Sequence, residues 1–264
     1  MTVYDDLAAE QERLESILAS LDEAQWASPS GAEGWTVADV VLHLAQAEEM
    51  VAASVERRGL SAAPGTQAGN VERRDLGAAP GMQAGNTVEE RAAGMVRAQR
   101  RDGAPAAAVF ERWQRARRAA LAALRGAGPD QPVQWVAGPV KPATLATTRL
   151  TEHWAHGLDI TGPLGIDFPD TGRLRHVAWL AHRTLPYALS LGGEPPVVVR
   201  FELTAPDGSE VWRLGPGDAG SAISGPAGEL CRVAVHRLDP ASSALQADGP
   251  DGAVALRWLR TYAK

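Results

Sequence analysis

Apolar residues recur at helical intervals through about the first 190 residues of the chain, and short β-rich runs follow. Leu7, Leu14, Leu18 and Leu21 predict an amphipathic helix over residues 3–24. Similar patterns predict helices at about 37–57, 105–125, 143–161 and 172–190, and Pro186 is expected to break the last of them. Residues 131–142 contain three prolines and are expected to form an extended connection.

The start of the second predicted helix carries a capping signal. Thr36 is followed three residues later by Asp39, the arrangement of a capping box. The Thr36 hydroxyl is expected to accept the Asp39 amide, and the Asp39 carboxylate suits the positive end of the helix dipole.

The pattern changes after Gly192-Gly193 and Pro195-Pro196. VVVRFEL (197–203) and EVWRLG (210–215) predict two strands, and Ala205-Pro206-Asp207-Gly208 between them is typical of a hairpin. A short strand at 221–225, a helix to about 237, a strand at 244–249 and a closing helix at 250–262 are expected to follow. The sequence therefore predicts a mainly α protein, with a helical domain over 1–192 and a small α+β domain over 193–264.

A tandem duplication interrupts the helical part. VERRGLSAAPGTQAGN (55–70) is repeated with three differences as VERRDLGAAPGMQAGN (71–86). Two short copies rich in Gly, Ala and Pro cannot form a solenoid, which needs more and larger units. Two interpretations remain, a solvated loop lengthened by duplication, which the composition favours, or a lid over a pocket.

Composition narrows the classes of function. Lys and Arg number 26 against 32 Asp and Glu, which argues against a nucleic-acid partner. No apolar run reaches the ~20 residues of a membrane span, and the acidic N-terminus does not resemble a signal peptide. The single cysteine, Cys231, excludes an internal disulfide or a multi-thiolate zinc site, so a cytoplasmic location is expected.

The predicted helix at 143–161 carries an ionisable stripe. Arg149, Glu152, His156 and Asp159 fall within a sector of about 80° around the helix. Such a stripe can be a solvated face, which is the commoner case. Glu152 and His156, however, are spaced i, i+4, so that a carboxylate oxygen and an imidazole nitrogen can converge on one metal ion.

His43 is the third candidate ligand. It lies among apolar neighbours on the second helix, where a lone histidine is more often a hydrogen-bonded core residue. In a helical bundle, metal sites are built from inward-pointing side chains of facing helices, and His43 with Glu152 and His156 would leave coordination positions open. His153 lies about 100° from Glu152 and is expected to be a pocket-wall or surface residue.

Two segments carry a resemblance to a known family. GWTVADVVLHLAQAEE (34–49) and RLTEHWAHGLDI (149–160) resemble the corresponding helices of the mycothiol-dependent maleylpyruvate isomerase-like family, within the DinB-like metal-binding superfamily. PVVVRFELTAPDG and SGPAGELCRVAVHR are similar to the family's C-terminal, sterol-carrier-like α+β domain. The resemblance covers nearly the whole chain except residues 55–86 and implies a DinB-like four-helix bundle followed by this domain.

The resemblance also implies cofactors. It places the family's divalent-metal ligands at His43, Glu152 and His156, with zinc the usual metal and iron, nickel or manganese also compatible with this ligand set. Mycothiol, a low-molecular-weight thiol, is the implied cosubstrate, and Arg237 is the best match to an arginine implicated in its use. The alternative for Arg237 is an ordinary cation near a helix C-terminus.

The implied chemistry assigns roles to the remaining residues. A metal-bound thiol becomes a thiolate, which adds to an electrophilic small molecule, and Cys231 is expected to be a packed, inert thiol. Arg149 could bind a substrate carboxylate or, more commonly, pair with Asp159 or Glu152. Asp159 is expected to accept a hydrogen bond from a ligand imidazole.

Three functions follow from the sequence. The first is a metal-dependent thiol transferase or cis–trans isomerase that uses mycothiol. The second is a thiol-independent enzyme whose metal acts as a Lewis acid on a specialised metabolite. The third is a non-catalytic protein that binds a small molecule or lipid, against which the intact set of candidate ligands argues.

Overall fold

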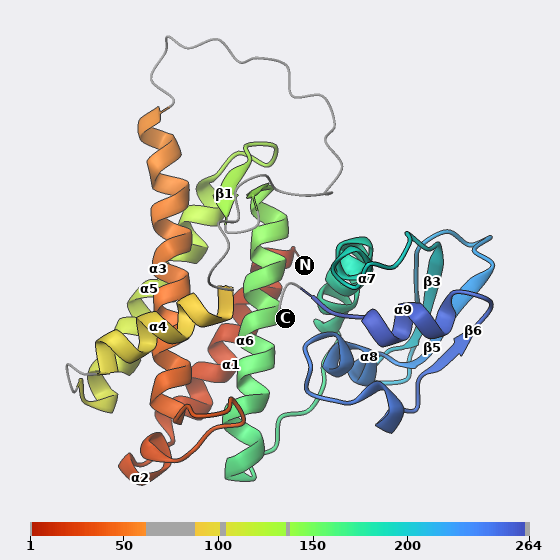
Figure 1. The fold of residues 1–264 in the computed structure, drawn as a ribbon. Coiled ribbons are helices and arrows are strands. Elements are labelled where there is room, and N and C mark those ends of the chain that lie inside the picture. Colours follow the sequence, from red (N-terminus) through yellow and green to blue (C-terminus); the bar gives the residue numbers. More distant parts are fainter. Residues whose placement is uncertain (1, 62–87, 101–103, 136–137, 262–264) are drawn as a thin grey trace. The chain divides into compact units, whose positions relative to one another are not determined.

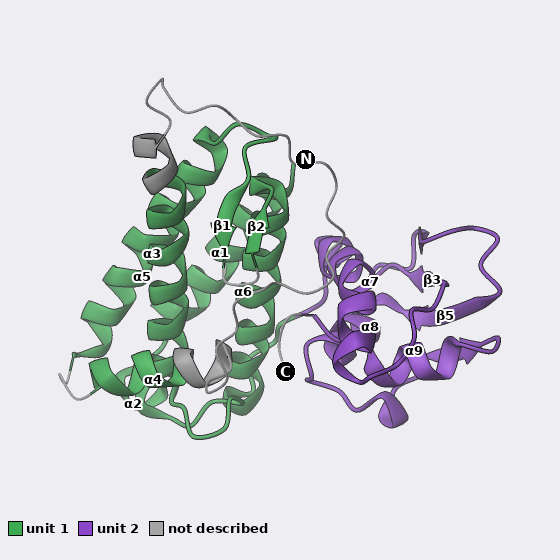
Figure 2. Cartoon of the chain, turned by 45° about the horizontal axis from the view of Figure 1, so that its top comes forward, with its two compact units in different colours: residues 1–168 green, residues 169–264 purple. Residues whose placement is uncertain are grey.

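The computed structural model describes residues 2–61, 88–100, 104–135 and 138–261. The chain divides into two compact units, Met1–Phe168 and Pro169–Lys264 (Figure 2). The first unit is helical apart from one small hairpin, and the second mixes helices with a four-stranded sheet. The prediction of a mainly α protein with a small α+β domain is confirmed. Residues 62–86 of the duplicated segment lie outside the described residues.

The first predicted helix is two helices in the structure. Helix α1 covers Val3–Ala19, and a short helix α2 covers Glu23–Ala27. Asp22 separates them because its carboxylate accepts the amide of Gln25 at 2.8 Å, which starts a new helix. The expectation of one helix over 3–24 is therefore wrong at its C-terminal end.

Helix α3 begins as its capping signal predicts. The Asp39 amide donates to Thr36 Oγ1 at 3.3 Å, and the Thr36 amide donates to Asp39 Oδ2 at 2.8 Å. The helix runs over Val37–Ser61, so the first residues of the duplication are helical. Helix α4, Val88–Arg100, was not predicted and follows the duplicated segment.

Four long helices form the core of the first unit. Helix α5 spans Ala106–Gly126, strands β1 (Val133–Trp135) and β2 (Gly138–Val140) form an antiparallel hairpin, and helix α6 spans Pro142–Leu164. Helices α1, α3, α5 and α6 run alongside one another (Figure 1) and bury leucine, valine and tryptophan side chains between them. None of the described helices combines the length and apolar character that a membrane span needs.

The second unit packs helices on a mixed sheet. Its elements are α7 (Leu174–Leu191), β3 (Val199–Thr204), β4 (Val211–Leu214), β5 (Ser221–Pro226), α8 (Ala227–Ala234), a 3-10 turn at Pro240–Ser242, β6 (Gln246–Asp248) and α9 (Gly252–Trp258). The strand order is β4-β3-β5-β6. Strands β3 and β4 form the predicted antiparallel hairpin, whereas β3 and β5 pair in parallel.

Two expectations about the segment that forms α7 are wrong. The division falls at 168/169 and not at 192/193, so α7 belongs to the second unit, where it packs against α8 and α9. Helix α7 also continues through Pro186. Proline removes one helical hydrogen bond, but the buried side chains of Leu185, Ala188 and Leu189 on either side hold the helix together.

Candidate metal centre

Three side chains from two helices converge in the first unit. His43 of α3 lies with Nε2 3.6 Å from Glu152 Oε2, and His156 of α6 lies with Nε2 3.5 Å from the same oxygen. The two imidazoles meet edge to face, with ring centroids 5.0 Å apart. One ligand atom from each residue lies within 4.8 Å of the others. We call this cluster the His–Glu–His trio.

The spacing of the trio fits a metal ion. Zinc binds imidazole nitrogen and carboxylate oxygen at about 2.0–2.2 Å, so two ligand atoms of a tetrahedral site lie about 3.4 Å apart. The separations of 3.5 and 3.6 Å come close to this value and are long for direct hydrogen bonds. Two imidazoles and one carboxylate are also the donor set of many catalytic zinc sites, which keep further positions open.

Glu152 is the most exposed side chain of the trio. The Glu152 side chain is 39% exposed, whereas those of His43 and His156 are 14% and 13% exposed. The ring of Trp35 packs against His43 with centroids 5.3 Å apart. A small molecule can therefore approach from the Glu152 side while the imidazoles remain held by their surroundings.

Asp159 orients one of the candidate ligands. Its Oδ2 lies 2.9 Å from His156 Nδ1, one helical turn away, which leaves Nε2 of that ring toward Glu152. The loop before α3 packs against the backbone of Asp159, because the Gly31 amide donates to the Asp159 carbonyl at 2.7 Å. A β-carbon on Gly31 would lie only 3.1 Å from Asp159 Cα, so a small residue permits this close approach.

The charges of the trio depend on one another. Burial by itself raises the pKa of Glu152, but the adjacent imidazoles of His156 and His43 and the charge of Arg149 hold that pKa well below its ordinary value. Burial lowers the pKa of His43. Burial acts in the same direction on His156, yet its hydrogen bond to Asp159 and the nearby carboxylate of Glu152 raise its pKa to about 9.

Arg149 has a partner that the sequence did not indicate. Its Nε donates to Glu48 Oε1 at 2.9 Å, and both side chains are buried, at 4% and 0% exposure. Glu48 takes the place of Asp159 or Glu152, the partners that the sequence suggested, and the binding of a substrate carboxylate by Arg149 stays a prediction. The guanidinium ties α3 to α6 inside the bundle.

His153 is a core residue. Its Nδ1 lies 2.8 Å from the Arg149 carbonyl, and Trp113 Nε1 of α5 donates to its Nε2 at 3.3 Å. The side chain is fully buried, and burial lowers the pKa of His153 to about 3. The expectation of a pocket-wall or surface position is therefore wrong, although its exclusion from the ligand set agrees with the geometry.

The remaining predicted residues lie in the second unit. Arg237 follows α8, is exposed and donates through Nη1 to the Val235 carbonyl at 2.7 Å. Its proposed role with mycothiol stays a prediction. Cys231 is fully buried, its Sγ lies 3.5 Å from the Leu174 carbonyl, and burial raises its thiol pKa far above the ordinary range. This thiol is inert, as expected.

Sequence reasoning missed Glu48. Glu48 lies five residues after His43, where an acidic residue on a helix is normally read as solvated. Its neighbours on the same helix face, Leu44 and Val51, are apolar, and that setting was the available signal for a buried carboxylate.

Replacing Asp159 by asparagine tests the orientation of His156. An amide can bind the wrong tautomer of the imidazole, so we expect Asp159→Asn to weaken zinc binding by about 10–100-fold, the usual effect of losing such a partner. Chelator competition measures the affinity. Asp170→Asn, which removes an ion pair with Arg232 in the other unit, is the matched control and should leave the affinity unchanged. Equal affinities in all three proteins would contradict the assigned role.

Comparison with known proteins identifies the family. The mycothiol maleylpyruvate isomerase N-terminal domain family matches residues 7–161. The uncharacterized proteins MT0041 and Rv0036c of Mycobacterium tuberculosis are each 31% identical over 256 residues, covering 96% of this chain and 91% of theirs.

Two solved structures share the fold. Both are crystal structures of mycothiol-dependent maleylpyruvate isomerase, one of them of a mutant form. The mutant matches with a TM-score of 0.59 at 15% identity, and the other with a TM-score of 0.58 at 16% identity. Each alignment covers 96% of both chains. The chain therefore belongs to the family of the mycothiol maleylpyruvate isomerase N-terminal domain.

Proposed function

We propose that this chain is a divalent-metal-dependent enzyme that activates mycothiol for addition to an electrophilic small molecule, as a thiol transferase or a cis–trans isomerase. The observation that carries the proposal is the His–Glu–His trio, with two Nε2 atoms 3.5 and 3.6 Å from one Glu152 oxygen and with the Glu152 side chain partly exposed. Family membership and the names of the two similar structures support mycothiol as the thiol.

The residues of the trio and Asp159 would have different roles in such a metal site. His43, Glu152 and His156 would hold the metal, which lowers the pKa of a bound thiol and so supplies a thiolate at neutral pH. Asp159 fixes the ring of His156 through Nδ1. The exposed edge of Glu152 leaves the approach for thiol and electrophile. Because Cys231 is buried and protonated, the nucleophilic sulfur has to come from outside the chain.

The two reactions share their first step. The thiolate sulfur forms a bond to one carbon of an activated double bond, and the π electrons move to the activating carbonyl. In an isomerase, the resulting single bond rotates, and elimination re-forms the double bond and returns the thiolate. In a transferase, a proton from water is added at carbon instead, and the thioether is released.

Mycothiol titration of zinc-loaded and zinc-free protein tests the proposal. We expect mycothiol to bind the zinc-loaded form at least ten times more tightly, because only that form can coordinate sulfur. S-methyl mycothiol, whose sulfur cannot become a thiolate, should lose this preference. With cobalt in place of zinc, a sulfur-to-cobalt charge-transfer band should appear on addition of mycothiol.

Two results would contradict the proposal. Equal affinity of mycothiol for both forms would remove the thiol from the site and favour Lewis-acid chemistry on a small molecule. Failure of the protein to take up one equivalent of zinc after reconstitution would remove the metal site itself.

A further inference from the structure

A buried ion pair joins the two helices that carry the trio. Glu48 lies on α3, five residues after His43, and Arg149 lies on α6, three residues before Glu152. Their side chains meet with Arg149 Nε 2.9 Å from Glu48 Oε1. Each partner is within two turns of a candidate ligand on its own helix, so the pair joins α3 and α6 close to the trio.

The pair is part of a buried polar network. His153 Nδ1 lies 3.6 Å from Glu48 Oε1 and 2.8 Å from the Arg149 carbonyl. Trp113 of α5 donates to the other nitrogen of His153, so the network reaches a third helix. Its members lie in the bundle interior, where a shift of one helix along another would break directional contacts that apolar side chains do not make.

Stability alone does not account for the pair. Replacing a buried ion pair by apolar residues of similar volume is often neutral or stabilising. Here Arg149 Nη2 and Glu48 Oε2 are buried and have no hydrogen-bond partner among the described residues, which adds to the cost of keeping the charges in the core. Specification of helix register is the best-attested role of such a pair.

The trio requires a precise register. A metal site tolerates deviations of only about 0.2 Å in ligand distance, whereas a slip of one helical turn would move His43 by about 5.4 Å along α6. The buried Glu48–Arg149 pair and the approach of His153 to Glu48 join side chains of α3 and α6 without involving the trio itself. The pair can therefore set the register before any metal is present.

We propose that Glu48 and Arg149 are positioning residues, which fix the register of α3 against α6 and so hold His43 at coordinating distance from Glu152 and His156. The inference rests on the metal site of the proposed function. Neither residue forms a hydrogen bond or an ion pair with a ligand atom of the trio, but the charge of Arg149 also acts on Glu152 and His43. A measurement of helix placement without metal therefore has to accompany the zinc affinity.

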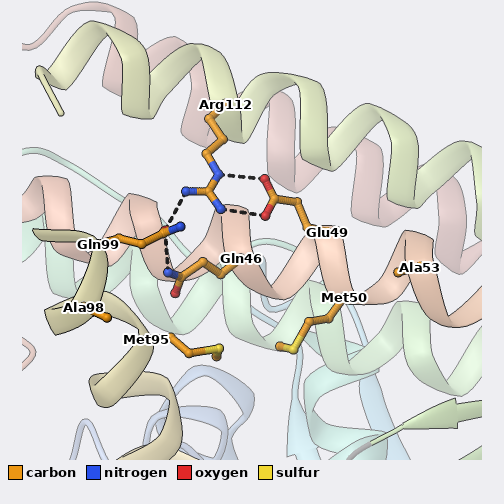
Figure 3. Close-up of a pocket in the computed structure, with 8 residues that line it drawn as sticks. All are labelled: Gln46, Glu49, Met50, Ala53, Met95, Ala98, Gln99 and Arg112. Carbon is orange, nitrogen blue, oxygen red and sulfur yellow. Dashed lines mark hydrogen bonds and ion pairs between the residues drawn. The ribbon is translucent and has the colours of Figure 1, made fainter. Parts of the chain in front are cut away.

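The chain offers a matched control pair on the same helix. Glu49, the next residue of α3, binds Arg112 of α5 through two hydrogen bonds of 2.7 Å (Figure 3). This pair borders an open groove of about 410 Å³ between α3, α4 and α5, and the side chains are 43% and 28% exposed. It has similar chemistry to the Glu48–Arg149 pair but ties α3 to a helix that carries no ligand.

The test compares two apolar double variants. Glu48→Met with Arg149→Met removes the buried pair and preserves its volume, and Glu49→Met with Arg112→Met removes the control pair. We expect both to unfold at a urea midpoint at or near that of the wild type. The first should bind zinc at least 30-fold more weakly and give an altered cobalt absorption spectrum, whereas the second should bind within threefold of the wild type.

A metal-free measurement separates this inference from the proposed function. Spin labels at Glu56→Cys and Ala143→Cys, exposed positions on α3 and α6, report the register of the two helices. We expect one narrow distance distribution in the wild-type background and a shifted or broadened one in Glu48→Met with Arg149→Met.

The outcomes are distinct. An unchanged distribution would overturn the positioning role, whatever the metal result, and so would wild-type zinc affinity in the Glu48–Arg149 double variant. If the wild type bound no zinc while the distribution still changed, the register role would hold and the proposed metal function would fall.

Discussion

Removing either imidazole of the trio, in His43→Ala or His156→Ala, is expected to abolish stoichiometric zinc binding. Loss of a residue that only orients a ligand costs about 10–100-fold in affinity, so loss of the ligand itself should cost more than about 100-fold. Chelator competition and the zinc content of the purified protein measure the effect. Both variants should keep the helical content of the wild type, since each deletes a side chain at the partly exposed edge of the bundle.

The nearest histidine cannot replace a lost ligand. His153 is adjacent to Glu152 in sequence, but its two nitrogens are engaged by Trp113 and by the Arg149 carbonyl. His182→Gln is the matched control, because that imidazole lies in the second unit and contacts the Val199 carbonyl at 3.0 Å. Full zinc content in His43→Ala and His156→Ala would show that the trio is not the metal site.

The part of the site on α6 could be predicted from spacing alone. Helix geometry fixes which side chains share a face, so Glu152, His156 and Asp159 had to lie together once the segment was helical. That His43 meets them is a tertiary fact. The sequence around His43 made it a candidate ligand on an apolar helix face, and the family resemblance supported its assignment to the metal site.

The errors have local causes as well. Glu48 and Arg149 each look like solvated residues, because only the pairing of two helices shows that their charges compensate one another inside the core. The domain boundary was set at the Gly192–Pro196 cluster because glycine and proline are strong loop signals. The connection after α6 also contains loop residues, Gly165, Pro169 and Gly172, and the packing of α7 against α8 and α9 decides to which unit this helix belongs.

Removing one member of the buried Glu48–Arg149 pair should destabilise the protein far more than removing both. Glu48→Met leaves the guanidinium of Arg149 without its counterion in the bundle interior, and Arg149→Met leaves the carboxylate in the same position. Breaking such a pair typically costs about 3–5 kcal/mol, because a charge stays buried without compensation. For Glu48, burial already raises the pKa and the charge of Arg149 opposes this, so the orphaned carboxyl is expected to fold protonated.

Urea denaturation of the four proteins in this cycle measures the coupling free energy. We expect about 3 kcal/mol or more for Glu48–Arg149, against about 0.2–1 kcal/mol for the more exposed Glu49–Arg112 pair, which water and salt screen. Near-additive single effects at Glu48 and Arg149 would mean that water reaches the charges and that the interior is less dry than the geometry indicates. A large coupling free energy would show that each charge compensates the other. A double variant as stable as the wild type would show that the fold does not depend on the pair for its stability. If the fold is stable without the pair, stability is not the reason for two charges in this core. The remaining role of the pair is to set the helix register and, through it, the geometry of the trio.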